Sequence, residues 1–88
     1  MKEIIIVGAL WCPSCLVMHK HYQKIEKEFP EFTYTRLDYD QHANEVKRWN
    51  VGKILPVLIV IKEGQEYGRL IGEKSYLQIH QFITGLAL

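Results

Sequence analysis

The residues with the clearest capacity for chemistry are two cysteines, Cys12 and Cys15, with two residues between them. They are the only cysteines in a chain of 88 residues. A disulfide between them would stabilise the fold little, because the entropy gained by cross-linking grows with the length of the closed loop. The pair is therefore poorly suited to be a structural cross-link. Three interpretations remain: a redox-active dithiol, half of a metal site, or two buried thiols.

The position of the pair says more than its spacing. Residues 4–7 form an apolar, β-branched run typical of a strand buried on both faces, and Pro13 suits the first turn of a helix. At a helix N-terminus, unpaired N–H groups and the helix dipole favour a thiolate over a thiol. We expect Cys12, at the helix tip, to reach solvent and to attack a substrate disulfide. Cys15, one turn further on, should be more covered and should resolve the mixed disulfide. Pro13 and Ser14 would set the strain and electrostatics of the small ring between the sulfurs.

The rest of the chain alternates between extended and helical patterns. After a first strand at 4–7 and a helix from residue 13 to 29, the sequence predicts a strand over 32–37, a short helix over about 41–50, strands over 57–61 and 66–71, and a helix from about 75 to 85. The first two strands are joined by a helix and should be parallel, whereas the last two share a short turn and should be antiparallel. We expect one α/β domain over residues 1–88, with the order β-α-β-α-β-β-α.

Particular side chains are expected to stop, start and bury these helices. Pro30 should end the first helix, Asp40 should cap the second, and Ser75 with Gln78 should form a capping box for the third. The apolar residues expected on the buried sides of the helices are Met18, Tyr22, Ile25 and Phe29; Ala43, Val46 and Trp49; and Leu77, Phe82, Ile83 and Leu86.

Composition and charge exclude several classes of function. Eleven basic and ten acidic residues leave a net charge of +1, which argues against a nucleic-acid binder. No apolar stretch is long enough to cross a membrane. The first residues lack the cleavage site of a signal peptide, so we expect a soluble, cytoplasmic protein. No separate cofactor is required, because a dithiol itself carries two electrons.

A strand that ends in Trp11-Cys12-Pro13-Ser14-Cys15 at a helix start, followed by a β-α unit and by Leu55-Pro56 before an apolar hairpin, resembles the thioredoxin/glutaredoxin superfamily over essentially the whole chain. The resemblance implies a thioredoxin fold, with a four-stranded mixed sheet in the order 2-1-3-4 flanked by helices. It also implies that Cys12 is the nucleophile and Cys15 the resolving thiol.

The same resemblance assigns supporting roles outside the motif. Trp11 precedes the first cysteine as in thioredoxins. Pro56 would be cis and lie against the dithiol, and the backbone of Leu55 would pair with the substrate chain. Gly72, in the turn before the last helix, is a further candidate for substrate contact.

The sequence also departs from the family pattern. Thioredoxins carry an additional N-terminal β-α unit, for which this chain has no room. They bury an aspartate six positions before the first cysteine, where it helps to deprotonate the resolving thiol, and this chain has Ile6 there. Residues 8–10 supply no basic residue of the kind that glutaredoxins use to bind glutathione. We therefore expect a monomeric thiol–disulfide oxidoreductase that takes electrons from a thioredoxin-reductase-like donor and reduces protein disulfides.

Three alternatives stay open at this point. The first is a glutathione-linked glutaredoxin. The second is a zinc site built on Cys12, Cys15 and His19, which have a plausible ligand spacing but lack a fourth ligand. The third is a non-catalytic binding module of thioredoxin-like shape.

Overall fold

The computed structural model describes residues 1–88. Seven elements follow one another along the chain: β1 (Lys2–Gly8), α1 (Pro13–Glu28), β2 (Thr33–Asp38), α2 (Ala43–Arg48), β3 (Val57–Lys62), β4 (Gln65–Ile71) and α3 (Tyr76–Gly85).

The four strands form one sheet in the order β2-β1-β3-β4. β1 pairs with β2 in parallel, whereas the β1–β3 and β3–β4 pairs are antiparallel. The predicted fold class, strand order and strand directions are confirmed. The carboxyl end of β1 lies between β2 and β3, so whatever follows Gly8 emerges at the middle of one sheet edge.

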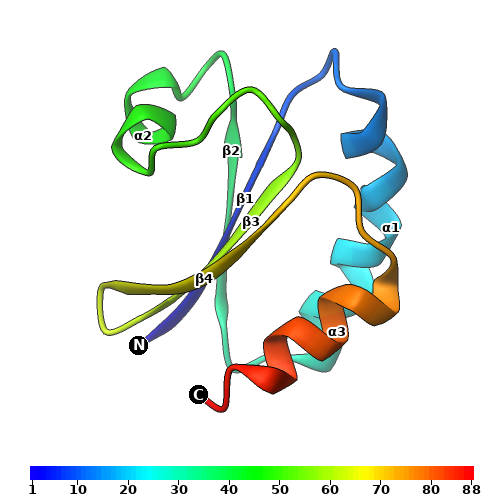
Figure 1. Cartoon of the computed structure of the whole chain (residues 1–88), viewed down its shortest axis with the longest axis vertical. Helices are drawn as coiled ribbons and strands as arrows, with labels where there is room; N and C mark the ends of the chain where they lie inside the picture. Colours follow the sequence, from blue (N-terminus) through cyan, green and yellow to red (C-terminus); the bar gives the residue numbers. More distant parts are fainter.

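Helices cover both faces of this sheet, as Figure 1 shows: α1 and α3 lie on one side and α2 on the other. Residues of β1 alternate between the two faces. Ile4 and Ile6 join a buried cluster with side chains of α1 and α3, whereas Ile5 and Val7 join a second cluster that includes Val46 of α2. None of the helices has the length and the apolar character needed to cross a membrane.

The start of α2 differs from the prediction. Its N-cap is His42, which makes no capping hydrogen bond through its side chain, and the helix begins at Ala43, which is exposed. The Asp38 carboxylate accepts hydrogen bonds from the backbone N–H groups of Asp40 and Gln41, 2.9 Å each. This turn holds the chain out of helical geometry until residue 42. The assignment of Asp40 as the cap is therefore wrong.

The capping box of α3 is confirmed: the Ser75 hydroxyl accepts from the Gln78 N–H, and the Gln78 side chain accepts from the Ser75 N–H. Leu77, however, is 60% exposed, and Ile79 is fully buried in its place. Ile79 and Ile83 lie four residues apart on the face toward the sheet, and Leu77 points away from them because two residues turn a helix by about 200°. The prediction of a buried Leu77 is wrong.

Candidate active site

Both cysteines lie where β1 passes into α1, in the position the sequence predicts. Cys12 is the N-cap of α1, with extended backbone angles, and Pro13 occupies the first turn. The Cys12 sulfur accepts a hydrogen bond from the backbone N–H of Cys15 at 3.3 Å. A sulfur at this point receives one of the helix N–H groups that have no partner within the helix, and such a donor stabilises negative charge. Both side chains are free thiols.

The exposure of the two thiols is the reverse of what we expect from the sequence. Cys12 is only 6% exposed, whereas Cys15 is partly exposed. Cys12 belongs to the apolar cluster on the α2 side of the sheet, with Ala9, Leu55 and Val57 among its members. The loop after β1 and the segment before β3 cover the helix tip, which the local sequence of α1 does not reveal.

The electrostatic surroundings of Cys15 favour its protonated form. Burial raises the pKa of the Cys15 thiol from 9.0 to about 11, and the hydrogen bond with the Cys12 side chain adds to the rise. At this pKa, about one Cys15 side chain in ten thousand is a thiolate at pH 7. Desolvation therefore outweighs the field of the helix N-terminus at this residue. With this raised pKa, Cys15 is favoured as a thiol rather than a thiolate at neutral pH.

The segment before β3 lies beside the dithiol. The peptide bond between Leu55 and Pro56 is cis, and both residues are buried. The backbone N–H of Gly72 donates to the Pro56 carbonyl at 2.8 Å, which ties the end of β4 to this segment. Gly72 has a φ of +89°, a conformation that favours glycine. The fold therefore brings Leu55, Pro56 and Gly72 to the same edge of the sheet as the cysteines.

Trp11 and Asp40 form a contact that the sequence analysis missed. The indole N–H of Trp11 donates to the Asp40 carboxylate at 2.7 Å, and the ring of Tyr39 meets the indole edge to face. Asp40 thus holds the residue before Cys12, and its carboxylate is engaged in this contact while His42 is the N-cap of α2. The contact could have been predicted only from the acidic residue in the loop after β2. Because β1 and β2 are parallel, the loops that follow them lie at the same edge of the sheet.

Large apolar side chains are exposed around the same edge. They come from the loop after β1, the outer side of α1, the segment before β3 and the end of β4: Leu10, Trp11, Leu16, Val17, Ile54 and Ile71. Exposed apolar residues gathered at one place are typical of a binding surface. This group is not predicted from the sequence, because the four segments come together only in the fold.

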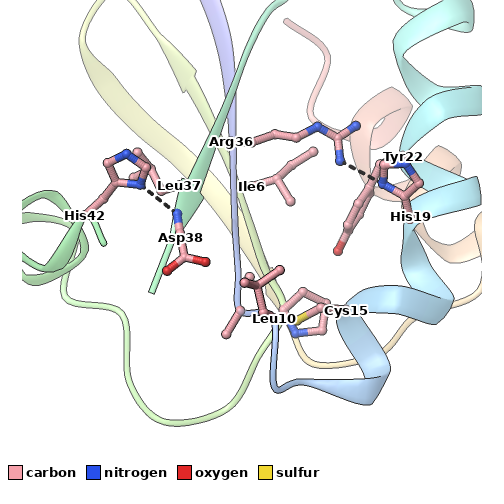
Figure 2. Close-up of a pocket in the computed structure, with 12 residues that line it drawn as sticks. Ile6, Leu10, Cys15, His19, Tyr22, Arg36, Leu37, Asp38 and His42 are labelled. Atoms are coloured by element: carbon pink, nitrogen blue, oxygen red, sulfur yellow. Dashed lines mark hydrogen bonds between the residues drawn. The ribbon is translucent and has the colours of Figure 1, made fainter. Parts of the chain in front are cut away.

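Behind the dithiol lies a pocket of about 320 Å³, shown in Figure 2. Cys15 and Ile6 line it together with His19 and Tyr22 of α1 and Arg36 of β2. From its sequence, Tyr22 is predicted in the core, and Arg36 carries no predicted role. The pocket brings a phenol, an imidazole and a guanidinium to the side of the sheet edge where Cys15 lies.

The structure gives no support to the zinc alternative. No three histidine, cysteine or acidic side chains gather in a way that could hold a metal ion. His19, the proposed third ligand, is exposed and lies with its Nδ1 3.4 Å from a guanidinium nitrogen of Arg36. A cation beside the imidazole does not favour a second cation there.

The comparison with known proteins agrees with this geometry. The family model named Thioredoxin matches residues 2–85. The chain belongs to the thioredoxin family. It is 30% identical over 76 residues to the H-type thioredoxin of Picea mariana, which covers 84% of this chain and 60% of that relative. It is 27% identical over 78 residues to the H-type thioredoxin of Fagopyrum esculentum, covering 89% and 66% of the two chains.

Solved thioredoxin structures have the same fold. The oxidised mitochondrial thioredoxin 3 of Saccharomyces cerevisiae superposes with a TM-score of 0.86 at 26% identity, over 96% of this chain and 77% of that chain. The thioredoxin of Trypanosoma brucei brucei reaches a TM-score of 0.89 over 99% of this chain and 75% of that one, at 24% identity, and supports the fold alone. The chain spans about two thirds or less of the length of the curated relatives named above.

Proposed function

We propose that this protein is a thiol–disulfide oxidoreductase that reduces disulfide bonds of other proteins through Cys12 and Cys15. The observation that carries the proposal is the position of the Cys12 sulfur. It lies at the N-terminus of α1, accepts the N–H of Cys15, and belongs to a chain of the thioredoxin family.

In the first step, the Cys12 thiolate attacks one sulfur of a substrate disulfide. A bond forms between the Cys12 sulfur and that substrate sulfur, and the second substrate sulfur leaves with the electron pair and takes up a proton from water. The exposed apolar side chains around the helix tip, Trp11 and Ile54 among them, are suited to bind the substrate chain during this step.

In the second step, Cys15 loses its proton and its sulfur attacks the Cys12 sulfur. The bond between Cys12 and the substrate breaks, and the substrate leaves as a thiolate that is then protonated. The two electrons of the dithiol have passed to the substrate, and the protein is left with a Cys12–Cys15 disulfide.

A donor of two electrons must then reduce this disulfide, and we infer a thioredoxin-reductase-like flavoprotein. No glutathione-binding base follows β1, and the family match is to thioredoxins, so the glutaredoxin alternative is not favoured. The protein is proposed to act as a monomer. A cytoplasmic location stays a prediction, and one relative at 30% identity is the mitochondrial thioredoxin-3 of Saccharomyces cerevisiae.

The test is reduction of insulin disulfides by the full chain, with dithiothreitol as electron donor, followed by the turbidity of the precipitating B chain. Cys12→Ser should abolish the acceleration, because serine cannot form the mixed disulfide. Lys20→Ser, a change at an exposed position of the same helix that removes no sulfur and lies outside the motif, is the matched control and should retain activity. Full activity of the Cys12→Ser variant would contradict the proposal.

A further inference from the structure

The pocket behind the dithiol contains a phenol that the proposed mechanism has not used. Tyr22 is only 3% exposed, yet its hydroxyl has no hydrogen-bond partner within the protein. It is not sealed in the core either, because no fully buried side-chain nitrogen or oxygen atom lacks a partner. The hydroxyl therefore opens into the pocket. Figure 2 shows the Tyr22 ring with its oxygen directed toward the end of the pocket where Cys15 lies.

The contacts of Tyr22 show that packing alone does not require a hydroxyl. Its ring belongs to the apolar cluster between the sheet and the helices, and the buried members of that cluster from β1, β3 and α3 are all apolar. A phenylalanine would fill the same space. Packing in this cluster therefore does not explain the hydroxyl, which lines the pocket and is free to bind a group there.

One neighbour of Tyr22 favours donation by its hydroxyl, and another is a candidate acceptor of that hydrogen bond. The guanidinium of Arg36 lies 5.9 Å from the centre of the Tyr22 ring, on its face. This cation stabilises electron density on the ring and so favours donation by the hydroxyl. Burial raises the pKa of Tyr22 and keeps the phenol protonated, and negative charge on Cys15 adds to the rise, so the two groups lie within electrostatic reach of each other.

Resting on the proposed function, we propose that the Tyr22 hydroxyl donates a hydrogen bond to the Cys15 thiolate formed in the resolving step. It would thus do part of the work of the buried carboxylate that the resemblance places at Ile6. The Cys15 proton leaves to water in the open pocket, the Cys15 sulfur bonds to the Cys12 sulfur, and the substrate sulfur departs with the electron pair. Tyr22 supplies stabilisation only and is neither oxidised nor deprotonated.

The test measures Cys15 directly and does not depend on disulfide reduction. In a Cys12→Ala background, Cys15 is the only thiol, and its alkylation by iodoacetamide reports its thiolate fraction at each pH. Adding Tyr22→Phe should raise the pKa of Cys15 and slow alkylation near pH 8 about tenfold, because a hydrogen bond to a charged group is lost. The other titratable or charged groups at this pocket are unchanged in both proteins: His19 of α1, Arg36 and Asp38 of β2, and His42 before α2.

The matched control is Tyr34→Phe. The Tyr34 hydroxyl donates to the backbone carbonyls of Ile25 and Phe29 and lies outside the pocket. Its loss should lower stability and leave the alkylation of Cys15 unchanged. Equal alkylation profiles with tyrosine and phenylalanine at position 22 would overturn the inference. If the unmodified chain did not reduce insulin disulfides at all, the proposed function would be overturned instead.

A second measurement keeps the test independent of folding of the Tyr22→Phe protein. In the Cys12→Ala chain with Tyr22 intact, the ¹³Cζ resonance of Tyr22 is followed as Cys15 titrates. The inference expects this resonance to shift with the apparent pKa of Cys15. A resonance that does not respond to ionisation of Cys15 would overturn the inference.

Discussion

Cys12 and Cys15 lie at the first turn of one helix and both touch the same apolar cluster, yet only Cys15 also faces the polar pocket. Cys12 is packed among apolar side chains from the loop after β1 and the segment before β3, under a rim of exposed apolar residues. Cys15 faces a pocket that holds a phenol, an imidazole and a guanidinium. The Cys12 side is suited to bind a substrate chain and the Cys15 side to handle a proton. The two steps of the proposed reaction therefore take place on different sides of the same pair of thiols.

The largest expected effect comes from removing one sulfur and keeping the other. In Cys15→Ser, attack by Cys12 should proceed while resolution is abolished, so a mixed disulfide between Cys12 and the substrate should accumulate to one per chain. Mass spectrometry under non-reducing conditions measures it. Cys12→Ser is the control and should form no such adduct. An equal yield of adduct in Cys12→Ser would contradict the assignment of the first attack to Cys12.

This division could be predicted from the sequence only in part. The strand and helix order followed from apolar periodicity and turn residues, which are local signals, and they also placed both cysteines at a helix start. The exposure of the cysteines was predicted in reverse, because Leu55 and Val57, far along the chain, cover Cys12. Tyr22 was correctly placed in a buried stripe, but its free hydroxyl acquires meaning only when Arg36 and Cys15 are near in space. Asp40 was misassigned because its partner, Trp11, lies 29 residues away.

A smaller change should disturb only the Cys15 side. A Cβ atom at Gly8 would lie 3.3 Å from the Cys15 sulfur, so Gly8→Ala must push that sulfur by a few tenths of an ångström. We expect resolution of the mixed disulfide to slow about tenfold, since misplaced reacting atoms are costly, while attack by Cys12 keeps its rate. Rapid-quench analysis separates the two steps. Gly52→Ala, where nothing lies within 4 Å of the added atom, is the control. If Gly8→Ala instead slowed the attack by Cys12, the prediction that this change affects only Cys15 would be wrong.

The raised pKa of Cys15 predicts a dependence of stability on pH. The folded state holds the Cys15 proton up to pH of about 11, whereas the unfolded chain releases it near 9.0. Stability from this group is therefore complete below about pH 9 and is lost as the pH rises toward 11. Because Cys15 is only partly buried and solvent screens it, we expect the loss to be about 1 kcal/mol. Urea unfolding of the reduced protein at pH 8 and at pH 10.5 measures it.

The control for this pH effect is Cys15→Ala under the same conditions. Groups such as Tyr34, whose pKa is also raised by burial, contribute to both proteins and cancel in the difference. The reduced unmodified chain should lose about 1 kcal/mol more than Cys15→Ala between the two pH values. Identical losses would mean that Cys15 carries no raised pKa.

The smallest expected effect lies on the Cys12 side. Asp40→Ala removes the acceptor of the Trp11 indole N–H, at an exposed position, and should lower the free energy of unfolding by about 0.5–1 kcal/mol. Trp11 fluorescence should change as the indole loses its neighbour, while the alkylation of Cys15 stays constant. Asp40→Asn retains an acceptor oxygen and should restore most of the stability. A change in the reactivity of Cys15 would show that the two sides are coupled.

The most direct test of the division of labour uses the unmodified, reduced chain. A substoichiometric amount of iodoacetamide is added at pH 7, and peptide mass spectrometry locates the label. A Cys15 thiol with a pKa of about 11 should react little, and Cys12, which accepts a helix N–H, should carry nearly all of the label. Equal labelling of the two cysteines, or preference for Cys15, would contradict the assignment of Cys12 as nucleophile and Cys15 as resolving thiol.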